Sequence, residues 1–169
     1  LVLRGDVART ADVEAILARI ESSAQPLRGI VHAAGVLDDR TLLDLGENQF
    51  WTPVRPKVLG AWNLHTATRQ LPLDFFVMYS SVAGLLGSRG QAAYSAANTF
   101  LDALSHARTA DGLTAMSLQW GPFAEVGLAA EQANRGLRMS HQGIASFTPE
   151  EGTAILSRLL LRPRAEVGL

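Results

Sequence analysis

Short apolar runs alternate with longer stretches of helical periodicity along the 169 residues of this chain. The short runs predict strands near residues 1–3, 29–33, 75–79, 115–119 and 165–167. Strands that alternate with helices are typical of βαβ units, which build a parallel sheet with both faces covered. We therefore predict an α/β fold.

Helices are expected between these strands. The first follows Thr10, which can cap it, and its apolar stripe repeats at i, i+3, i+4 and i+7. The second is predicted over residues 54–69, with Pro53 and Pro56 tolerated only near its first turn. The third is predicted over residues 92–109.

The last helix carries a clear start signal. Thr148, Pro149 and Glu151 supply an N-cap, a proline at the first helical position and a capping-box acid. The preceding residues, 123–146, contain several glycines and lack strong periodicity, which predicts a long loop that serves as a substrate lid.

Composition narrows the class of protein. With 47% hydrophobic residues, the chain can bury the core of one domain, and its 15 basic and 16 acidic residues favour neither nucleic acid nor an anionic membrane. It has no cysteine, no apolar run of membrane-spanning length and no signal-peptide pattern. We expect a protein of the cytoplasm with a small or protein-tethered substrate.

Small residues follow four of the predicted strands, at positions where open parallel sheets bind ligands. These segments are 5–7, 32–35, 80–81 and 120–122. Small side chains let a flat cofactor approach the backbone. Each segment alone would also suit a tight turn, but four together favour a binding edge.

Four polar residues have the chemistry of carbonyl reduction. Hydride transfer leaves negative charge on the carbonyl oxygen, which Tyr94 could protonate and Ser81 could hydrogen-bond. Lys57 could favour the phenolate, and Asn98, at i+4 from Tyr94, could hold a water that links lysine to solvent. Taken singly, each residue also suits an ordinary structural role.

The sequence resembles the ketoreductase domains of modular polyketide synthases. The matching motifs cover essentially the whole chain and lie at residues 32–39, 57–61, 79–84, 87, 90–92, 94, 96–98 and 120–122. In this family, lysine and asparagine have exchanged places relative to most short-chain dehydrogenases, and Lys57 and Asn98 match the exchanged arrangement. The resemblance implies catalytic Lys57, Ser81, Tyr94 and Asn98.

The resemblance also implies a Rossmann-like doubly wound sheet, an NADPH cofactor and a β-ketoacyl thioester on the phosphopantetheine arm of an acyl carrier protein. Cofactor contacts carry over residue by residue: Asp6 and Val7 to the adenine, Ala33, Ala34 and Gly35 to the adenosine side, Lys57 and Tyr94 to the nicotinamide ribose, Gly121 and Pro122 to the nicotinamide end. Other domains of the same synthase are the further partners that it implies.

The resemblance also implies the stereochemistry of the product, from one triplet and one single residue. Leu37, Asp38 and Asp39 match the triplet of the B-type group, which usually gives the D-configured hydroxyl. Leu86 stands eight residues before Tyr94, where the A-type group has tryptophan. Without the family, Asp38 and Asp39 would read as a solvated acidic turn.

Two groups of residues suggest a phosphate loop and a metal site, but their spacing fits neither. Gly84, Gly87 and Gly90 have the wrong spacing for a nucleotide phosphate loop, so we interpret them as an active-site turn. The histidines at 32, 65, 106 and 141 lack metal-ligand spacing, so we predict no metal site and place them at the surface or behind the active site.

Alternatives remain open at this stage. No glycine-rich cofactor loop precedes Leu1, so residues 1–169 are expected to be the carboxy-terminal, catalytic part of a domain whose first βαβα units lie elsewhere. A fatty-acid-synthase ketoreductase has a similar arrangement. A freestanding short-chain dehydrogenase should instead show Tyr-x-x-x-Lys. After ketoreductases and freestanding dehydrogenases, the third function class is a non-catalytic structural or interaction module.

Overall fold

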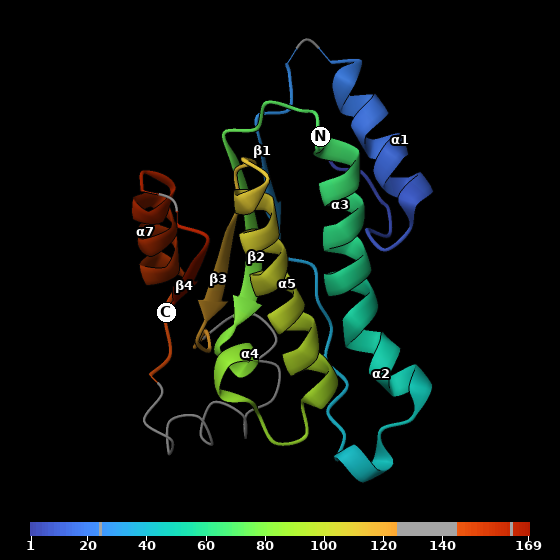
Figure 1. Cartoon of the computed structure of the whole chain (residues 1–169), viewed down its shortest axis with the longest axis vertical. Coiled ribbons are helices and arrows are strands. Elements are labelled where there is room, and N and C mark those ends of the chain that lie inside the picture. The colour runs from blue at the N-terminus through green and yellow to red at the C-terminus, as the bar shows by residue number, and fades with distance from the viewer. Residues whose placement is uncertain (24, 125–144, 163) are drawn as a thin grey trace.

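The computed structural model describes residues 1–23, 25–124, 145–162 and 164–169. In this part of the chain, four strands form one parallel sheet in sequence order (Figure 1). They are β1 (Gly29–His32), β2 (Phe75–Ser81), β3 (Met116–Trp120) and β4 (Glu166–Gly168). The predicted α/β fold is confirmed.

Helices lie before β1 and in the connections between the strands. They are α1 (Thr10–Glu21), α2 (Glu47–Val54), α3 (Gly60–Thr68), α4 (Val82–Leu86), α5 (Ala92–Ala110) and α7 (Pro149–Leu160), with a 3-10 turn η1 (Leu42–Asp44) and a π-helical segment η2 (Arg55–Leu59). The capping box of Thr148 and Glu151 is present, and α5 follows its predicted range. None of the helices in the described ranges is long and apolar enough to span a membrane.

Helices cover both faces of the sheet, and the alternation of side chains along β2 decides which residue meets which helix. Phe76 and Met78 pack with Leu101 of α5 and with residues of α3. Val77 points to the opposite face, into a cluster completed by residues of β3 and α7. This two-sided core is the doubly wound arrangement that the resemblance implied.

The strand predicted at residues 1–3 is absent. Leu1 and Val2 are 90% and 93% exposed, and these residues pair with none of the described strands. Apolar composition alone does not make a strand, because the ladder needs hydrogen bonds from a neighbouring strand. Thr10 was also misassigned: Arg9 is the N-cap, and the Thr10 hydroxyl donates to Asn63 Oδ1 at 3.2 Å.

The predicted helix over residues 54–69 begins earlier and contains both prolines. Pro53 lies inside α2, and Pro56 lies in η2, where the Gly60 amide bonds to the Arg55 carbonyl five residues back. A proline lacks the amide hydrogen that a helix interior needs, and Pro56 lies in the first turn of η2, where that hydrogen is not required. The first-turn requirement was therefore wrong for Pro53, which lies near the end of α2.

The predicted lid, residues 123–146, falls largely on residues 125–144, which lie outside the described residues. At its two ends, the backbone of Phe147 donates to the Pro122 carbonyl and accepts from Ala124, both at 2.9 Å. The two ends of this segment are therefore held together beside β3.

Gly60 is required by close packing, which leads to a stability prediction. A Cβ at this position would lie 2.7 Å from Val7 Cγ1 and 3.1 Å from His32 Cε1. We expect Gly60→Ala to lower the free energy of unfolding by about 1–3 kcal/mol through overpacking, despite the better helix propensity of alanine. Urea unfolding of the complete polypeptide measures the change.

The matched control is Thr66→Ala, at an exposed position of the same helix. It should leave stability unchanged or slightly raised. Equal midpoints for Gly60→Ala and wild type would contradict the packing argument.

Candidate active site

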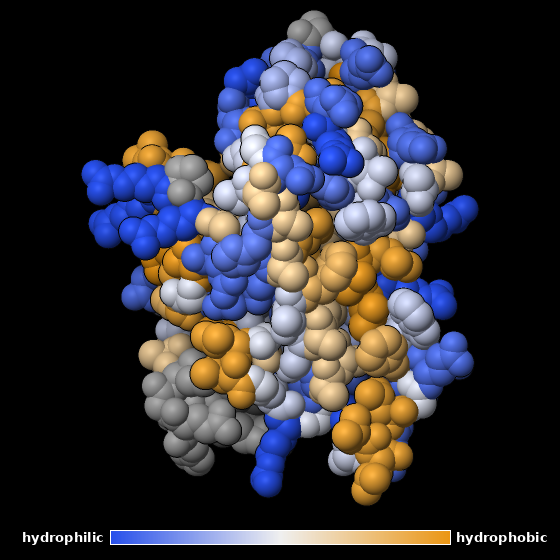
Figure 2. All heavy atoms as spheres, viewed as in Figure 1, coloured by the Kyte–Doolittle hydropathy of each residue, from blue (hydrophilic) through white to orange (hydrophobic). Residues whose placement is uncertain are grey.

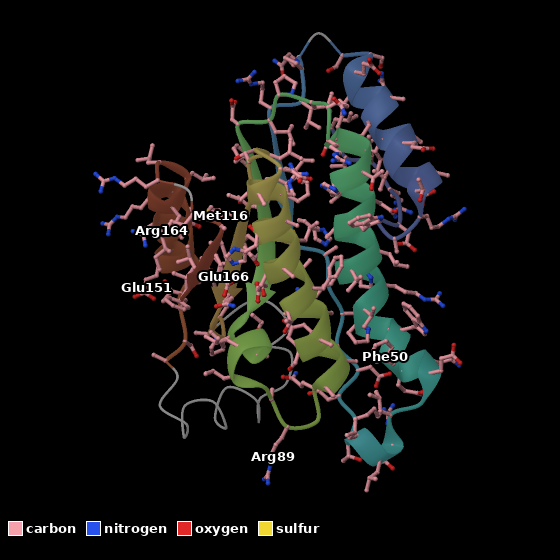
Figure 3. The ribbon with its side chains drawn as sticks, in the orientation of Figure 1. Phe50, Arg89, Met116, Glu151, Arg164 and Glu166 are labelled. Carbon is pink, nitrogen blue, oxygen red and sulfur yellow. The ribbon has the colours of Figure 1, made fainter. Side chains whose placement is uncertain are left out.

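The carboxyl ends of the strands, helix α4 and the start of α5 meet at one edge of the sheet, at the lower end of the molecule in Figure 1. Two pairs of exposed leucines flank this edge, Leu42 and Leu43 on η1 and Leu85 and Leu86 on α4 (Figure 2). Between them, Arg89 points away from the turn that precedes α5 (Figure 3). This is the edge at which the sequence predicted a site.

Lys57 lies at the centre of this edge and is only 4% exposed. Its ammonium donates to the Tyr79 carbonyl of β2 at 2.7 Å and lies 5.4 Å from the centre of the Tyr94 ring. One side chain from η2 thus contacts both β2 and α5. The structure brings lysine and tyrosine together as predicted.

Burial changes the acidity of Lys57. Loss of solvent lowers its pKa from 10.5 to about 8, and the negative charge of Asp102 opposes part of that shift. A lysine with such a pKa exchanges protons near neutral pH, which an ordinary surface lysine does not.

Ser81 ends β2 and is the N-cap of α4, where its hydroxyl oxygen accepts from the Ala83 amide at 3.2 Å. Because the oxygen accepts this bond, the hydroxyl proton is left to donate to a ligand at the edge of the sheet. The neighbouring Ser80 donates to the Asn98 carbonyl at 3.3 Å and so fastens β2 to α5.

Asn98 is completely buried one turn after Tyr94. Its amide nitrogen donates to the Tyr94 carbonyl at 2.8 Å, and its Oδ1 has no partner among the described residues. A buried acceptor of this kind can hold a water or a donor group. Tyr94 itself is half-buried.

The loop that carries Leu37, Asp38 and Asp39 is tied to the start of α5. Gln91 Nε2 donates to Asp39 Oδ1 at 3.1 Å, and the Arg40 amide donates to the Gly90 carbonyl at 2.8 Å. Asp38 instead pairs with Arg40 at 2.9 Å. Gln91 stands three residues before Tyr94 and connects the triplet to the helix that bears the tyrosine.

The segments expected to contact the cofactor fall into two groups. Near the end of β1, Val7 packs on Gly60 and its carbonyl accepts from Asn63, while Asp6 Oδ1 accepts from the Ala8 amide.

The residues Ala33, Ala34 and Gly35 follow β1 and are exposed or half-buried. Gly121 and Pro122, after β3, are buried. Leu86, at the end of α4, is exposed.

Two of the predicted surface or second-layer histidines, His32 and His65, are buried. His32 is 3% exposed beside Lys57, and burial with the nearby ammonium lowers its pKa to about 4. His65 is also buried and contacts Arg108. His32 thus lies behind the site, one of the two placements predicted for it, whereas His65 does not lie at the surface.

Sequence reasoning missed the contact between Gln91 and Asp39. The sequence also contains a second signal for Lys57, which is the only lysine in the chain. Arginine serves at every other basic position, but an arginine cannot be brought to a pKa near neutral.

The KR domain family model matches residues 1–125. The phenolphthiocerol synthesis polyketide synthase type I Pks15/1 of Mycobacterium marinum is 46% identical over 161 residues, which cover 94% of this chain and 8% of that protein. The spectinabilin polyketide synthase system protein NorB of Streptomyces orinoci is 44% identical and covers 95% of this chain and 7% of its own. The chain thus spans less than a tenth of these relatives.

Solved structures agree in fold. An A-type ketoreductase from a modular polyketide synthase has a TM-score of 0.93 and 36% identity, with 98% of this chain and 35% of that one covered. The first ketoreductase of the tylosin synthase has a TM-score of 0.84 and 36% identity, with 97% and 35% covered.

The lowered pKa of Lys57 makes a prediction about stability and pH. Because the folded pKa of about 8 lies below the unfolded 10.5, the unfolded chain binds more protons between these values, and stability rises with pH across that window. Lys57→Met removes this titration. We expect the variant to be more stable than wild type at pH 7, by about 3 kcal/mol at most, and the advantage to vanish by pH 10.5.

Urea unfolding of both proteins at several pH values measures the difference, in which the titration of other groups largely cancels. A difference that stays constant from pH 7 to pH 10.5 would contradict a lowered pKa for Lys57.

Proposed function

Because the chain belongs to the KR domain family, we propose that it carries the catalytic residues of a polyketide synthase ketoreductase. The proposed reaction is NADPH-dependent reduction of the β-keto group of a thioester, tethered to an acyl carrier protein, to a β-hydroxyl. The observation that carries this proposal is the buried Lys57 in contact with both the Tyr79 carbonyl and the Tyr94 ring.

Tyr94 is the proposed proton donor to the carbonyl oxygen. It lies in the first turn of α5, half-buried, so its hydroxyl can face the edge of the sheet where the strands end. Ser81, whose oxygen already accepts from Ala83, supplies the second hydrogen bond to the same oxygen. Both donors stabilise charge that develops only as the carbonyl is reduced.

Lys57 acts through Tyr94. An ammonium beside the ring stabilises the phenolate that remains after the proton has been transferred. After the phenol has given up its proton, Lys57 can return one, and Asn98 with its unpartnered Oδ1 can hold the water that reconnects the lysine to solvent.

The residues at this edge fit a nicotinamide cofactor. The ammonium of Lys57 and the hydroxyl of Tyr94 are suitable partners for ribose hydroxyls, and the small side chains at 33–35 admit a flat group near the backbone. NADPH would supply the hydride, while Asp6, Val7, Gly121 and Pro122 would hold its two ends.

The partners follow from the relatives. The matched polyketide synthases are far longer than this chain, which favours other domains of one synthase as neighbours and a carrier-bound acyl chain as substrate. One relative, at 43% identity, is described as a putative inactive synthase, so a non-catalytic module is the second candidate. The ordered contacts of Lys57, Asn98 and Tyr94 favour catalysis.

Removal of the Tyr94 hydroxyl tests the proton-donor role. In the complete domain, we expect Tyr94→Phe to lower kcat for reduction of a β-ketoacyl thioester by about 10²–10⁴-fold, because the proton transfer loses its donor. NADPH affinity should be largely retained. Consumption of NADPH and fluorescence titration measure the two quantities.

Ser157→Ala, on the exposed side of α7, is the control and should keep wild-type turnover. Undiminished reduction by Tyr94→Phe would refute the role, and absence of reduction in the wild-type domain would favour the non-catalytic module.

Product configuration tests the B-type assignment. With Leu37, Asp38 and Asp39 present and Leu86 in place of tryptophan, we expect the D-configured β-hydroxyl in large excess, measured by chiral chromatography of the product. Asp39→Asn weakens the contact with Gln91 and should lower this excess more than it lowers NADPH affinity. A predominantly L-configured product would overturn the assignment.

A further inference from the structure

A buried carboxylate lies on α5 beneath the site. Asp102 is 7% exposed and stands one turn beyond Asn98, on the side of α5 that faces the sheet. Its oxygens accept from the Ser117 hydroxyl and from Gln119 Nε2, the latter at 2.9 Å. Both donors are neutral, so these bonds hold the carboxylate without neutralising its charge.

The strand register places this carboxylate next to the attachment point of Lys57. Tyr79, whose carbonyl accepts from Lys57, is in register with Leu118 of the neighbouring strand. The residues on either side of Leu118 are Ser117 and Gln119, which hold Asp102. Adjacent strands lie about 4.8 Å apart, so the two opposite charges are bound to neighbouring points of one sheet.

The other ionisable groups around Lys57 do not provide a negative charge. His32, from β1, has a pKa of about 4 and is neutral near pH 7. Tyr94, from α5, is the proposed acid. Glu166, at the start of β4, lies beyond Gln119 and contacts His106 at 2.9 Å (Figure 3). Among the described residues, Asp102 is the carboxylate that raises the pKa of Lys57 against the effect of burial.

We propose that Asp102 is a positioning residue for carbonyl reduction, a buried counter-charge that keeps Lys57 protonated beneath Tyr94. The effect of Asp102 on carbonyl reduction rests on the proposed ketoreductase function, whereas its effect on the charge of Lys57 does not. Without the counter-charge, burial would leave the lysine neutral over more of the physiological range, and a neutral amine does not stabilise a phenolate. Asp102 thus extends the line that Tyr94 and Asn98 begin along α5.

The test is the titration of Lys57 in Asp102→Asn, which keeps the shape of the side chain and removes its charge. Trace acetylation with acetic anhydride over a pH series, read by mass spectrometry of the peptide that contains Lys57, measures the midpoint directly in the complete domain. We expect the midpoint to fall by about one pH unit relative to wild type.

Asp111→Asn is the matched control, since Asp111 ends the same helix but is exposed and pairs with Arg69. It should leave the Lys57 midpoint unchanged. In activity assays, the alkaline limb of the kcat profile should move to lower pH in Asp102→Asn alone. A folded Asp102→Asn protein with the wild-type midpoint would overturn the proposal.

A double variant, Asp102→Asn with Ser117→Asp, returns a carboxylate to the same pocket from β3. It should restore the wild-type midpoint, whereas a purely structural role for Asp102 predicts no such rescue. If circular dichroism shows that Asp102→Asn alone does not fold, the double variant decides: a wild-type midpoint supports the counter-charge, and a lowered one overturns it.

Acetylation needs neither NADPH nor a thioester. A wild-type domain that fails to reduce its substrate would therefore refute the proposed function, while the Lys57 midpoints would still decide the role of Asp102.

Discussion

A single buried ammonium connects the parts of this structure. Lys57 leaves the π-helical segment η2, donates to the Tyr79 carbonyl and faces the ring of Tyr94, so helix, sheet and active-site tyrosine meet at one charge. Burial of a lysine is unfavourable unless its hydrogen bonds are made, and it lowers the pKa to about 8. Burial of Lys57 therefore lowers the stability of the folded chain, and it also makes Lys57 able to exchange protons near neutral pH.

The two faces of the sheet divide stability from chemistry. Toward α7, β3 presents Met116, Leu118 and Trp120, and this side is an apolar core. Toward α5, the same strand presents Ser117 and Gln119, which bind Asp102. Polar residues four apart on α5 fall on this second side because the helical period is 3.6. The side of the sheet that faces α5 therefore holds the buried carboxylate of Asp102, while the opposite side is apolar.

The loop after β1 is coupled to that same helix. Gln91 binds Asp39 directly before α5, so a change in the Leu-Asp-Asp loop reaches the tyrosine through one hydrogen bond and one helical turn. This contact gives a physical route by which the triplet could orient substrate relative to the proton donor. In the family, the triplet is only correlated with product configuration, and the correlation by itself gives no physical link between the loop and the tyrosine.

Local features of this chain were predictable from sequence, because they depend on neighbours within a few residues: the capping box at Thr148, the range of α5, and the spacing that places Asn98 one turn after Tyr94. Motif resemblance then identified the family. Tertiary structure decided what depends on distant partners. Leu1 and Val2 pair with none of the described strands. Lys57 bonds to β2 and Asp102 to residues of β3, and the charge of Asp102 acts on Lys57 from the neighbouring strand. Burial and pKa arise from that packing, which no local pattern encodes.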